Sequence, residues 1–306
     1  MVSQSRSPGS HPSVHNLGFL YANGLGTATD YQEAAEWYRR AAEQGHAPAQ
    51  NNLGRLYFHG RGVRKDFREA ADWLRKAAEQ GFAASQTSLG ELYAKGQGVP
   101  HSDVEAVQWY RKAADAGDAT AQASLGFMYA RGMGLSRDAS EAIKWYRKAV
   151  EQGNAAAQAN LGYMYSQGHG VTKDLEKAAQ WFLKSAEQQN VIGQHNLGFA
   201  LLNGLGVNKN HSEAVKLFRK SAEQGFARAQ NYLGWMYFHG YGVPKDYVHA
   251  HKWFTLAVSR IETWDSEIRA SALNNSKAVA AKMTETQIAE AHKLAREWDT
   301  KRERTR

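Results

Sequence analysis

The 306-residue sequence contains no cysteine, which excludes disulfide bonds and thiolate metal sites and leaves the redox compartment open. It also lacks any apolar run of the roughly 18 residues that a membrane-spanning helix needs. Residues 1–8, MVSQSRSP, lack the apolar segment of a secretory signal, and we expect them to form a disordered tail. As written, the chain is expected in the cytoplasm; a periplasmic or secreted location stays open if the N-terminus is truncated.

Signatures of catalysis are missing as well. No HExxH, GxSxG or P-loop motif occurs. His249 and His251 form the closest pair among the twelve histidines, but residues two apart do not face the same side of a helix. We therefore expect no catalytic residue, no metal site and no cofactor, and we predict that the chain is not an enzyme.

What the sequence does contain is a repeat of 36 residues. A leucine recurs at this step, at Leu17, Leu53, Leu89, Leu125, Leu161, Leu197 and Leu233. In the second repeat, the apolar pattern predicts one helix from about Ala47 to His59 and another from about Asp66 to Gln80. Gly60 and Gly62 separate the two helices, because a tight turn needs backbone conformations that glycine adopts at low cost. The same pattern in every repeat predicts an all-α chain.

Two further features of the repeat predict local structure. Asp66 and Glu69 form a capping box that starts the second helix, whereas repeats five and seven have Lys177 and His249 in place of the glutamate, so we expect weaker helix starts there. Gly54 lies inside the first helix at a cost of about 1 kcal/mol. We expect it to allow a close helix approach, with Ala70 and Ala77 as the small partners and with Trp73 supplying bulk.

These residues form the pattern A-x-A-Q-x-x-L-G-x-x-Y-x-x-G-x-G-V, then D-x-x-x-A-x-x-W-x-x-K-A-A-x-Q-G. The pattern resembles the Sel1-like repeat, a relative of the tetratricopeptide repeat, over residues 9–260. The resemblance implies an α-solenoid of seven helix-turn-helix repeats that acts as an adaptor or scaffold. Members occur in bacterial signalling, envelope and virulence-related systems and in eukaryotic protein quality control, and the family has no shared catalytic site.

Residues 261–306 lie outside the repeat pattern, and we predict that they form a C-terminal helical cap with a basic tail. Ile261, Trp264, Ile268 and Ala272 suggest one apolar stripe, and a capping box that begins at Thr284 opens a second helix.

Repeat six departs most from the pattern. Leu201 replaces the tyrosine, Leu217 the tryptophan, and Gly193 an alanine. We expect this repeat to be the weakest joint, because glycine adds backbone freedom.

The net charge of +8 raises the alternative of a binder of nucleic acid or of another anionic polymer. A basic residue in the last turn of most second helices complements the helix dipole, which favours an ordinary solvated face: Arg40, Lys76, Lys112, Lys148, Lys184 and Lys220. We therefore expect no nucleic-acid partner. A non-catalytic subunit of an enzyme complex is a further alternative.

The position two residues after the repeated leucine provides the candidate binding surface. First helices line the concave side in this class of solenoid, so residues at this position form a row along a groove. We predict a protein-protein interaction scaffold that binds a partner protein or peptide there, with inter-repeat packing as the alternative role of the same residues. The predicted partner-binding residues are Phe127, Tyr163, Phe199, Trp235 and Phe238, with Asn160 and Asn196 beside them and Arg55 and Glu91 at the polar end.

Overall fold

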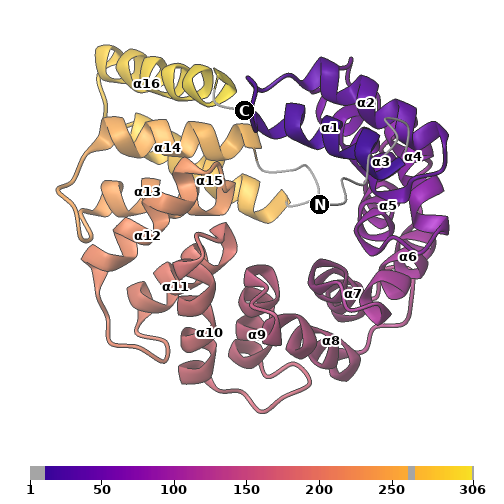
Figure 1. Cartoon of the computed structure of the whole chain (residues 1–306). Coiled ribbons are helices and arrows are strands. Elements are labelled where there is room, and N and C mark those ends of the chain that lie inside the picture. The colour runs from indigo at the N-terminus through magenta and orange to yellow at the C-terminus, as the bar shows by residue number, and fades with distance from the viewer. Residues whose placement is uncertain (1–10, 261–265, 305–306) are drawn as a thin grey trace. The chain divides into compact units, whose positions relative to one another are not determined.

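The computed structural model describes residues 11–260 and 266–304, and this part of the chain consists of sixteen α-helices without a β-strand (Figure 1). The helices are α1 (His11–Asn23), α2 (Tyr31–Glu43), α3 (Ala47–His59), α4 (Phe67–Glu79), α5 (Ala83–Lys95), α6 (Asp103–Asp115), α7 (Ala119–Arg131), α8 (Ala139–Glu151), α9 (Ala155–Gln167), α10 (Leu175–Glu187), α11 (Val191–Asn203), α12 (His211–Glu223), α13 (Ala227–His239), α14 (Tyr247–Arg260), α15 (Ser266–Ala280) and α16 (Glu285–Arg304). The predicted all-α solenoid fold is confirmed. None of the described helices combines the length and the apolar character needed to cross a membrane.

The chain divides into two compact units. Unit 1 ends at Asn154 and contains α1–α8, and unit 2 begins at Ala155 and contains α9–α16. Odd-numbered helices up to α13 are the first helices of the repeats and even-numbered helices up to α14 are the second helices. Each repeat is therefore a helical hairpin, and the next repeat in the same unit packs against it.

The structure contains one of the two interactions of the predicted capping box at the start of the second helix. The Asp66 carboxylate accepts hydrogen bonds from the amides of Arg68 (2.8 Å) and Glu69 (3.2 Å). The amide of Asp66, however, donates to the Tyr57 carbonyl at 3.0 Å, because the turn brings the end of the first helix back to this point. The glutamate side chain is therefore not needed to satisfy the cap amide.

This arrangement corrects the expectation of weak helix starts in repeats five and seven. Lys177 Nζ lies 2.9 Å from the Asp174 carboxylate, and His249 Nδ1 lies 2.7 Å from the Asp246 carboxylate. Each residue that replaces the glutamate therefore adds a contact to the cap residue, and neither cap amide loses its carbonyl partner.

The glycine inside each first helix allows close contact with the second helix, as predicted. A β-carbon on Gly54 would lie 2.8 Å from Leu74 Cγ and 3.1 Å from the Ala70 carbonyl oxygen. Trp73, from which we expect bulk, is half-buried and packs against the core, and the neighbouring Leu74 is fully buried. Every other repeat buries an aromatic ring at this position: Tyr38, Tyr110, Tyr146, Phe182, Phe218 and Phe254.

The second glycine of the turn has a role beyond the turn itself. A β-carbon on Gly62 would collide with the carbonyl of Tyr31 at the start of the preceding second helix. The equivalent glycines of four other repeats meet the preceding repeat in the same way: Gly98, Gly134, Gly206 and Gly242. This glycine therefore sets how closely successive hairpins approach.

A ladder of glutamines joins the two helices of a repeat to each other and to the preceding repeat. The buried Gln50 donates from Nε2 to the Ala42 carbonyl, and its Oε1 accepts from Gln80 Nε2 at 2.7 Å. The same side-chain pair, thirty residues apart, recurs as Gln122 with Gln152, Gln158 with Gln188 and Gln194 with Gln224. Gln86 interrupts this series, because its buried Oε1 has no hydrogen-bond partner among the described residues and Ala116 stands where the donor would be.

We predict that Ala116→Gln stabilises the protein by about 1 kcal/mol, because the new side chain would donate to Gln86 Oε1. Ala116 is exposed at the C-terminal cap of α6, so the larger side chain needs no new space. Urea denaturation of both proteins measures the gain. The double variant Gln86→Ala/Ala116→Gln is the control, since the gain should disappear when the acceptor is absent.

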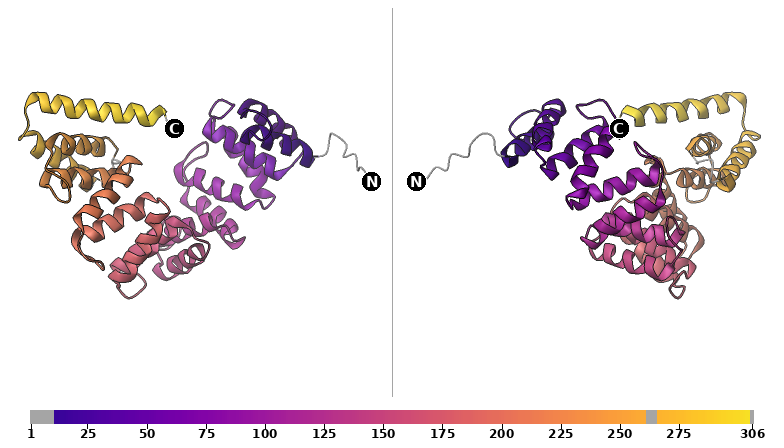
Figure 2. Two further views of the ribbon diagram at one scale, coloured as in Figure 1. Left: turned by 60° about the vertical axis from the view of Figure 1, so that its left-hand side comes forward. Right: turned by 90° about the vertical axis from the view of Figure 1, so that its right-hand side faces the viewer.

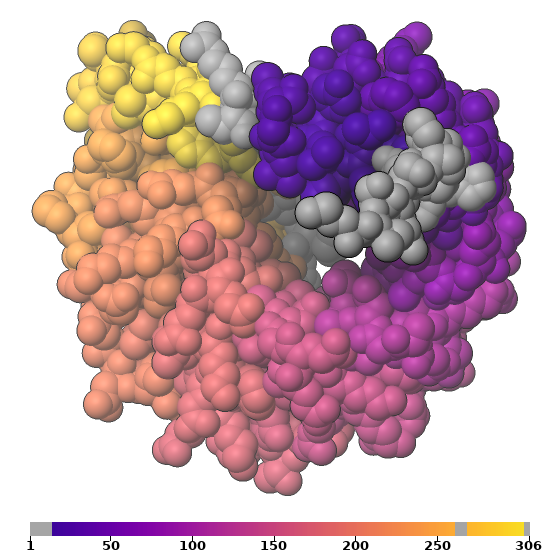
Figure 3. All heavy atoms as spheres, viewed as in Figure 1, coloured from indigo at the N-terminus to yellow at the C-terminus, as the bar shows by residue number. Residues whose placement is uncertain are grey.

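Two helices close the end of unit 2. Figures 1 and 2 show α15 beside α14 and the long α16 running across α14, and Figure 3 shows the side chains of α16 lying against α14. The capping box of α16 is complete, with Thr284 N donating to Gln287 Oε1 (2.9 Å) and Gln287 N donating to Thr284 Oγ1 (3.3 Å). In the predicted stripe of α15, Ala272 is buried and Ile268 half-buried, while Ile261 and Trp264 lie outside the described residues.

Repeat six, where we expect the weakest joint, makes a close contact with the preceding repeat. Gly193 is buried, and a β-carbon there would collide with the side chain of Ser185, whose hydroxyl donates to the Ala155 carbonyl at 2.7 Å. The glycine thus makes room for a serine that occupies an alanine position of earlier repeats. Elsewhere an arginine donates to a tyrosine hydroxyl eighteen residues later. Here Leu183 and Leu201 replace both partners, so neither position has a polar group that needs a hydrogen bond.

We predict that Gly193→Ala destabilises the protein by about 1–3 kcal/mol, because the added methyl group overpacks the contact with Ser185. Thermal or urea denaturation measures the change. A stabilisation of about 1 kcal/mol, the usual result of removing glycine from a helix, would contradict the close contact.

Candidate functional site

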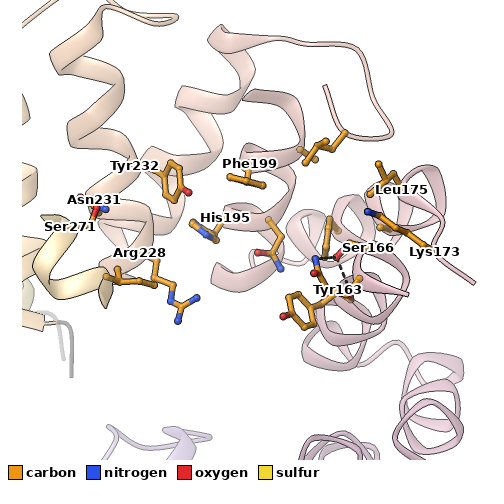
Figure 4. A pocket seen from close by; sticks show the side chains of 17 residues that line it. Tyr163, Ser166, Lys173, Leu175, His195, Phe199, Arg228, Asn231, Tyr232 and Ser271 are labelled. Atoms are coloured by element: carbon orange, nitrogen blue, oxygen red, sulfur yellow. Dashed lines mark hydrogen bonds between the residues drawn. The ribbon is translucent and has the colours of Figure 1, made fainter. Parts of the chain in front are cut away.

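Unit 2 contains a cavity of about 480 Å³ on the side formed by its first helices (Figure 4). Helices α9, α11 and α13 supply most of its wall, and α15 adds Ile268 and Ser271. The apolar part of the lining consists of Leu175, Ala178, Phe182, Ala200 and Leu205. Because the repeat places equivalent residues of successive first helices side by side, one cavity collects side chains that are 36 residues apart in the sequence.

Two aromatic side chains of the predicted row line this cavity. Tyr163 on α9 is 49% exposed and Phe199 on α11 is 36% exposed. The Phe199 ring makes an edge contact with Tyr232 of α13, with the ring centres 5.6 Å apart. Large rings that stay this exposed in a folded protein keep apolar area available for a ligand.

His195 is the most deeply buried ionisable group of the cavity. It is 8% exposed and lies among the rings of Phe218, Phe226 and Tyr232, with centres 5.3–5.6 Å away. Its Nδ1 has no hydrogen-bond partner among the described residues. Burial, and to a smaller extent the positive charge of Arg228, lower the pKa of His195 to about 3, so the ring is neutral at neutral pH.

The repeat register explains why this nitrogen is unpaired. In repeat two the same position is Asn51, whose Oδ1 accepts a hydrogen bond from Ser85 Oγ of the next repeat at 2.9 Å. In repeat six the position is His195, and the residue that would face it is Ala229. The hydrogen bond that Asn51 makes with the next repeat is therefore absent at His195.

The described charged residues that line the cavity are both cationic, Lys173 and Arg228. Among the side chains that the structure describes, no aspartate or glutamate belongs to the lining. Its other polar groups include the side-chain amides of Asn196 and Asn231, of which Asn231 accepts from Asn275 at 3.3 Å. The cavity thus combines an apolar floor, exposed rings, amides and positive charge (Figure 4).

Of the predicted site residues, the structure brings Tyr163, Asn196 and Phe199 together in this cavity. Trp235 and Phe238 are half-buried and pack against the core cluster of Ala250, Phe254 and Val279, which agrees with the packing alternative. Asn160 is half-buried on α9 and does not line the cavity. Phe127, Arg55 and Glu91 belong to unit 1, where Phe127 is 38% exposed and Glu91 pairs with Lys95.

Sequence reasoning missed three residues of this site, His195, Arg228 and Tyr232. A signal was available for two of them: Tyr232 stands where the other repeats have asparagine or serine, and Arg228 where they have small or apolar residues. Neither residue belongs to the aromatic row, so the row did not predict them.

The histidine pair of α14 lies outside the cavity, and its two rings contact different partners. His249 contacts Asp246 and stacks on Tyr237, while His251 Nδ1 lies 3.2 Å from Ser276 Oγ. Across the part of the chain that the structure describes, no three histidines, aspartates or glutamates gather in a way that could hold a metal ion.

Comparison with known proteins now adds to this geometry. The Sel1 repeat model matches residues 11–46, 47–82, 83–118, 119–154, 155–190, 191–226 and 227–260. The chain belongs to the Sel1 repeat family.

Two solved structures resemble this Sel1 repeat protein over most of its length. A Sel1 repeat protein from Oxalobacter formigenes is 34% identical, with a TM-score of 0.71, and the match covers 80% of this chain and 96% of that one. A protective antigen of uropathogenic Escherichia coli strains, which displays an SLR fold, is 30% identical with a TM-score of 0.52 over 94% of this chain and 84% of that one. No curated protein matches the chain.

The burial of His195 predicts a dependence of stability on pH. Its folded pKa lies below the ordinary 6.5, so between these values the unfolded chain binds a proton that the folded chain does not, and stability falls as the pH decreases below about 6.5. Between about pH 7.5 and 5.5, we expect the free energy of unfolding to fall by about 1.4 kcal/mol more in the wild type than in the His195→Asn variant. Urea denaturation at the two pH values measures both losses, and equal losses would mean that His195 titrates normally in the folded state.

Proposed function

We propose that this Sel1 repeat protein is a protein-protein interaction scaffold and that its unit 2 binds a polypeptide segment of a partner in the cavity described above. The observation that carries the proposal is the combination of the exposed rings of Tyr163 and Phe199 with an apolar floor. Aromatic side chains bury much area with few rotors to immobilise, which is why they dominate binding hot spots. In this proposal, Trp235 and Phe238 support the binding surface indirectly, because they pack α13 against the core.

The dimensions and chemistry of the cavity favour a peptide. Its volume of about 480 Å³ lies in the range of ligand pockets, and it is large enough for one or two side chains. The amide of Asn196 beside Phe199 offers both a donor and an acceptor to a peptide backbone. An extended segment or a helix that places one apolar side chain in the cavity would use both features.

Unit 1 offers an exposed aromatic at the same repeat position, Phe127. We propose it as a separate contact, with Arg55 and Glu91 as the polar positions of that surface. Its ring lies 5.7 Å from the guanidinium of Arg131, which leaves this surface more polar than the cavity of unit 2.

The basic residues support a nucleic-acid binder less well than a protein-protein interaction scaffold. The lysines in the last turns of the second helices lie over tryptophan rings, with nitrogen-to-ring distances of 3.9 Å for Lys76 and 4.1 Å for Lys112 and Lys148. These contacts assign the lysines a local packing role. No particular observation favours the alternative of a non-catalytic enzyme subunit over a general scaffold.

A peptide selection tests the proposal. We expect a displayed random-peptide library to yield sequences that bind the full chain, and we expect Tyr163→Ala and Phe199→Ala each to weaken these peptides by at least tenfold, about 1.4 kcal/mol. Fluorescence anisotropy gives the Kd, and circular dichroism verifies that each variant is folded.

Leu273→Ala serves as the matched control, since Leu273 is 42% exposed in unit 2 and does not line the cavity. This variant should bind like the wild type. Peptides that bind Tyr163→Ala and Phe199→Ala with unchanged Kd would place the binding surface elsewhere.

A further inference from the structure

We infer that the turn between α3 and α4 is a second interaction surface of this protein and that it binds an acidic segment of a partner protein, one that carries several side-chain carboxylates. The inference goes beyond the proposed function, since the turn belongs to unit 1 and the cavity to unit 2. It starts from four cations with exposed side chains in residues 61–68: Arg61, Arg64, Lys65 and Arg68.

The charge of this turn differs from that of every other repeat. Residues 61–69 contain these four cations and two carboxylates, Asp66 and Glu69. At the equivalent residues of each of the other six repeats, carboxylates equal or outnumber the lysines and arginines. Because every repeat builds the same turn, the fold does not require the additional arginines of repeat two. Residues that depart from the local pattern in this way concentrate at functional sites.

The positive charge of the turn is not neutralised by ion pairs. Among the described residues, none of the four cations pairs with a carboxylate, and the Lys or Arg ion pairs of unit 1 lie elsewhere: Arg75 with Asp72, Lys95 with Glu91, and Lys144 with Glu141. The nearby cap carboxylates are already engaged. Asp66 accepts two amides of the first turn of α4, and Asp30 accepts two amides of the first turn of α2.

Two of the cations lie over aromatic rings. Lys65 Nζ is 4.7 Å from the centre of the Phe67 ring, and the guanidinium carbon of Arg61 is 5.6 Å from the centre of the Tyr31 ring. A ring positions a cation by its quadrupole but carries no net charge. These contacts therefore orient Lys65 and Arg61 and leave their charges available to a ligand.

His59, at the end of α3, reports the positive field of the turn. Partial burial and then the charge of Arg61 lower the pKa of His59. Arg55 and Lys65 act in the same direction, and Glu91 acts against them. The cations of the turn thus act together on one neighbouring side chain.

The other three cations share an open groove of about 500 Å³ that extends to the next repeat. Its lining consists of Arg64, Lys65, Asp66, Phe67, Arg68 and Gly98. Phe67 is half-buried and adds apolar area to the groove. Arginine is suited to carboxylates in particular, because its planar guanidinium can donate two parallel hydrogen bonds to one carboxylate. An acidic segment could therefore pair with several side chains of the groove at once.

The small extent of the surface favours a protein segment over a nucleic acid. A nucleic acid has a negative charge at every phosphate and is held by cations that follow its backbone. Here the turns on both sides are acidic, since residues 25–33 and 97–105 each contain two carboxylates and no lysine or arginine. A long polyanion would meet repulsion on both sides of repeat two, whereas a short acidic segment would not.

Two eight-residue peptides that differ only in charge test the inference, one with four glutamates and one with four glutamines at the same positions. We expect the full chain to bind the glutamate peptide with a Kd lower by about tenfold or more than that of the glutamine peptide. Fluorescence anisotropy measures both Kd values. The difference should shrink as the salt concentration rises, because salt screens exposed charges.

A triple variant locates the site. Arg61→Gln, Arg64→Gln and Arg68→Gln together should raise the Kd of the glutamate peptide by about tenfold and leave that of the glutamine peptide near the wild-type value. Circular dichroism verifies that the variant is folded. If it fails to fold, Arg64→Gln alone decides the question, with an expected rise of about threefold.

The matched control has the same net charge as the triple variant. It replaces by glutamine three exposed arginines of unit 1 outside the turn: Arg40, Arg137 and Arg147. We expect it to bind the glutamate peptide with a Kd within about twofold of the wild-type value, because screening weakens the effect of distant charges.

Several results would overturn the inference. Equal affinity for the two peptides, or an unchanged Kd in the triple variant, would remove the acidic segment as the ligand of this turn. Equal losses in the triple variant and the control would indicate general attraction by the net charge. A single-stranded DNA with the same number of charges that binds more tightly than the glutamate peptide, through the same arginines, would make nucleic acid the ligand.

Variants of the cavity separate this inference from the proposed function. Tyr163→Ala and Phe199→Ala should bind the glutamate peptide like the wild type. Loss of binding in these variants would place the acidic segment in the cavity of unit 2 and overturn the inference. Failure of the glutamate peptide to bind would overturn the inference and leave the cavity proposal to the library selection.

Discussion

The fold depends on one close backbone contact, in which the second turn glycine of a repeat lies against the first carbonyl of the preceding second helix. Gly62 against Tyr31 is the example in unit 1 and Gly206 against Leu175 the example in unit 2. A side chain at this glycine would push the hairpins apart, and the glutamine bonds between repeats, such as that from Gln50 Nε2 to the Ala42 carbonyl, would then lose their geometry. The spacing between hairpins is therefore set by backbone and amide contacts rather than by large side chains.

Since these contacts hold each hairpin to the next, the outward positions of the first helices are free to vary. The repeat position that Tyr163 and Phe199 occupy in unit 2 is occupied by Arg55 and Glu91 in unit 1, and the first helices have the same length in both units. Such a division between fixed contacts and variable surface is what a binding scaffold requires, because a new ligand can be accommodated by substitutions that leave the fold intact.

The sequence predicted the parts of this structure that follow from local rules. The 36-residue period and the glycines placed α3 and α4 correctly, and Asp66 was recognised as the helix cap. The features that were not predicted depend on contacts made across the turn or between repeats. The Tyr57 carbonyl that satisfies the Asp66 amide, the burial of Leu74 and the contact of Gly193 with Ser185 all require knowing how one helix lies on another.

The candidate site could be predicted only in part, for a related physical reason. The exposed rings of Tyr163 and Phe199 follow from the repeat register, but the cavity between them also needs His195, Arg228 and two residues of α15. His195 occupies a position where Asn51 makes a hydrogen bond between repeats, and it gives that bond up. A solenoid can accept such a loss in one repeat because Gln230 Nε2 still donates to the Ala222 carbonyl at 3.1 Å across the same interface. The free-energy cost of the unpaired His195 Nδ1 is thus confined to a single interface between repeats. At the same position, this nitrogen is left to form a hydrogen bond with a binding partner.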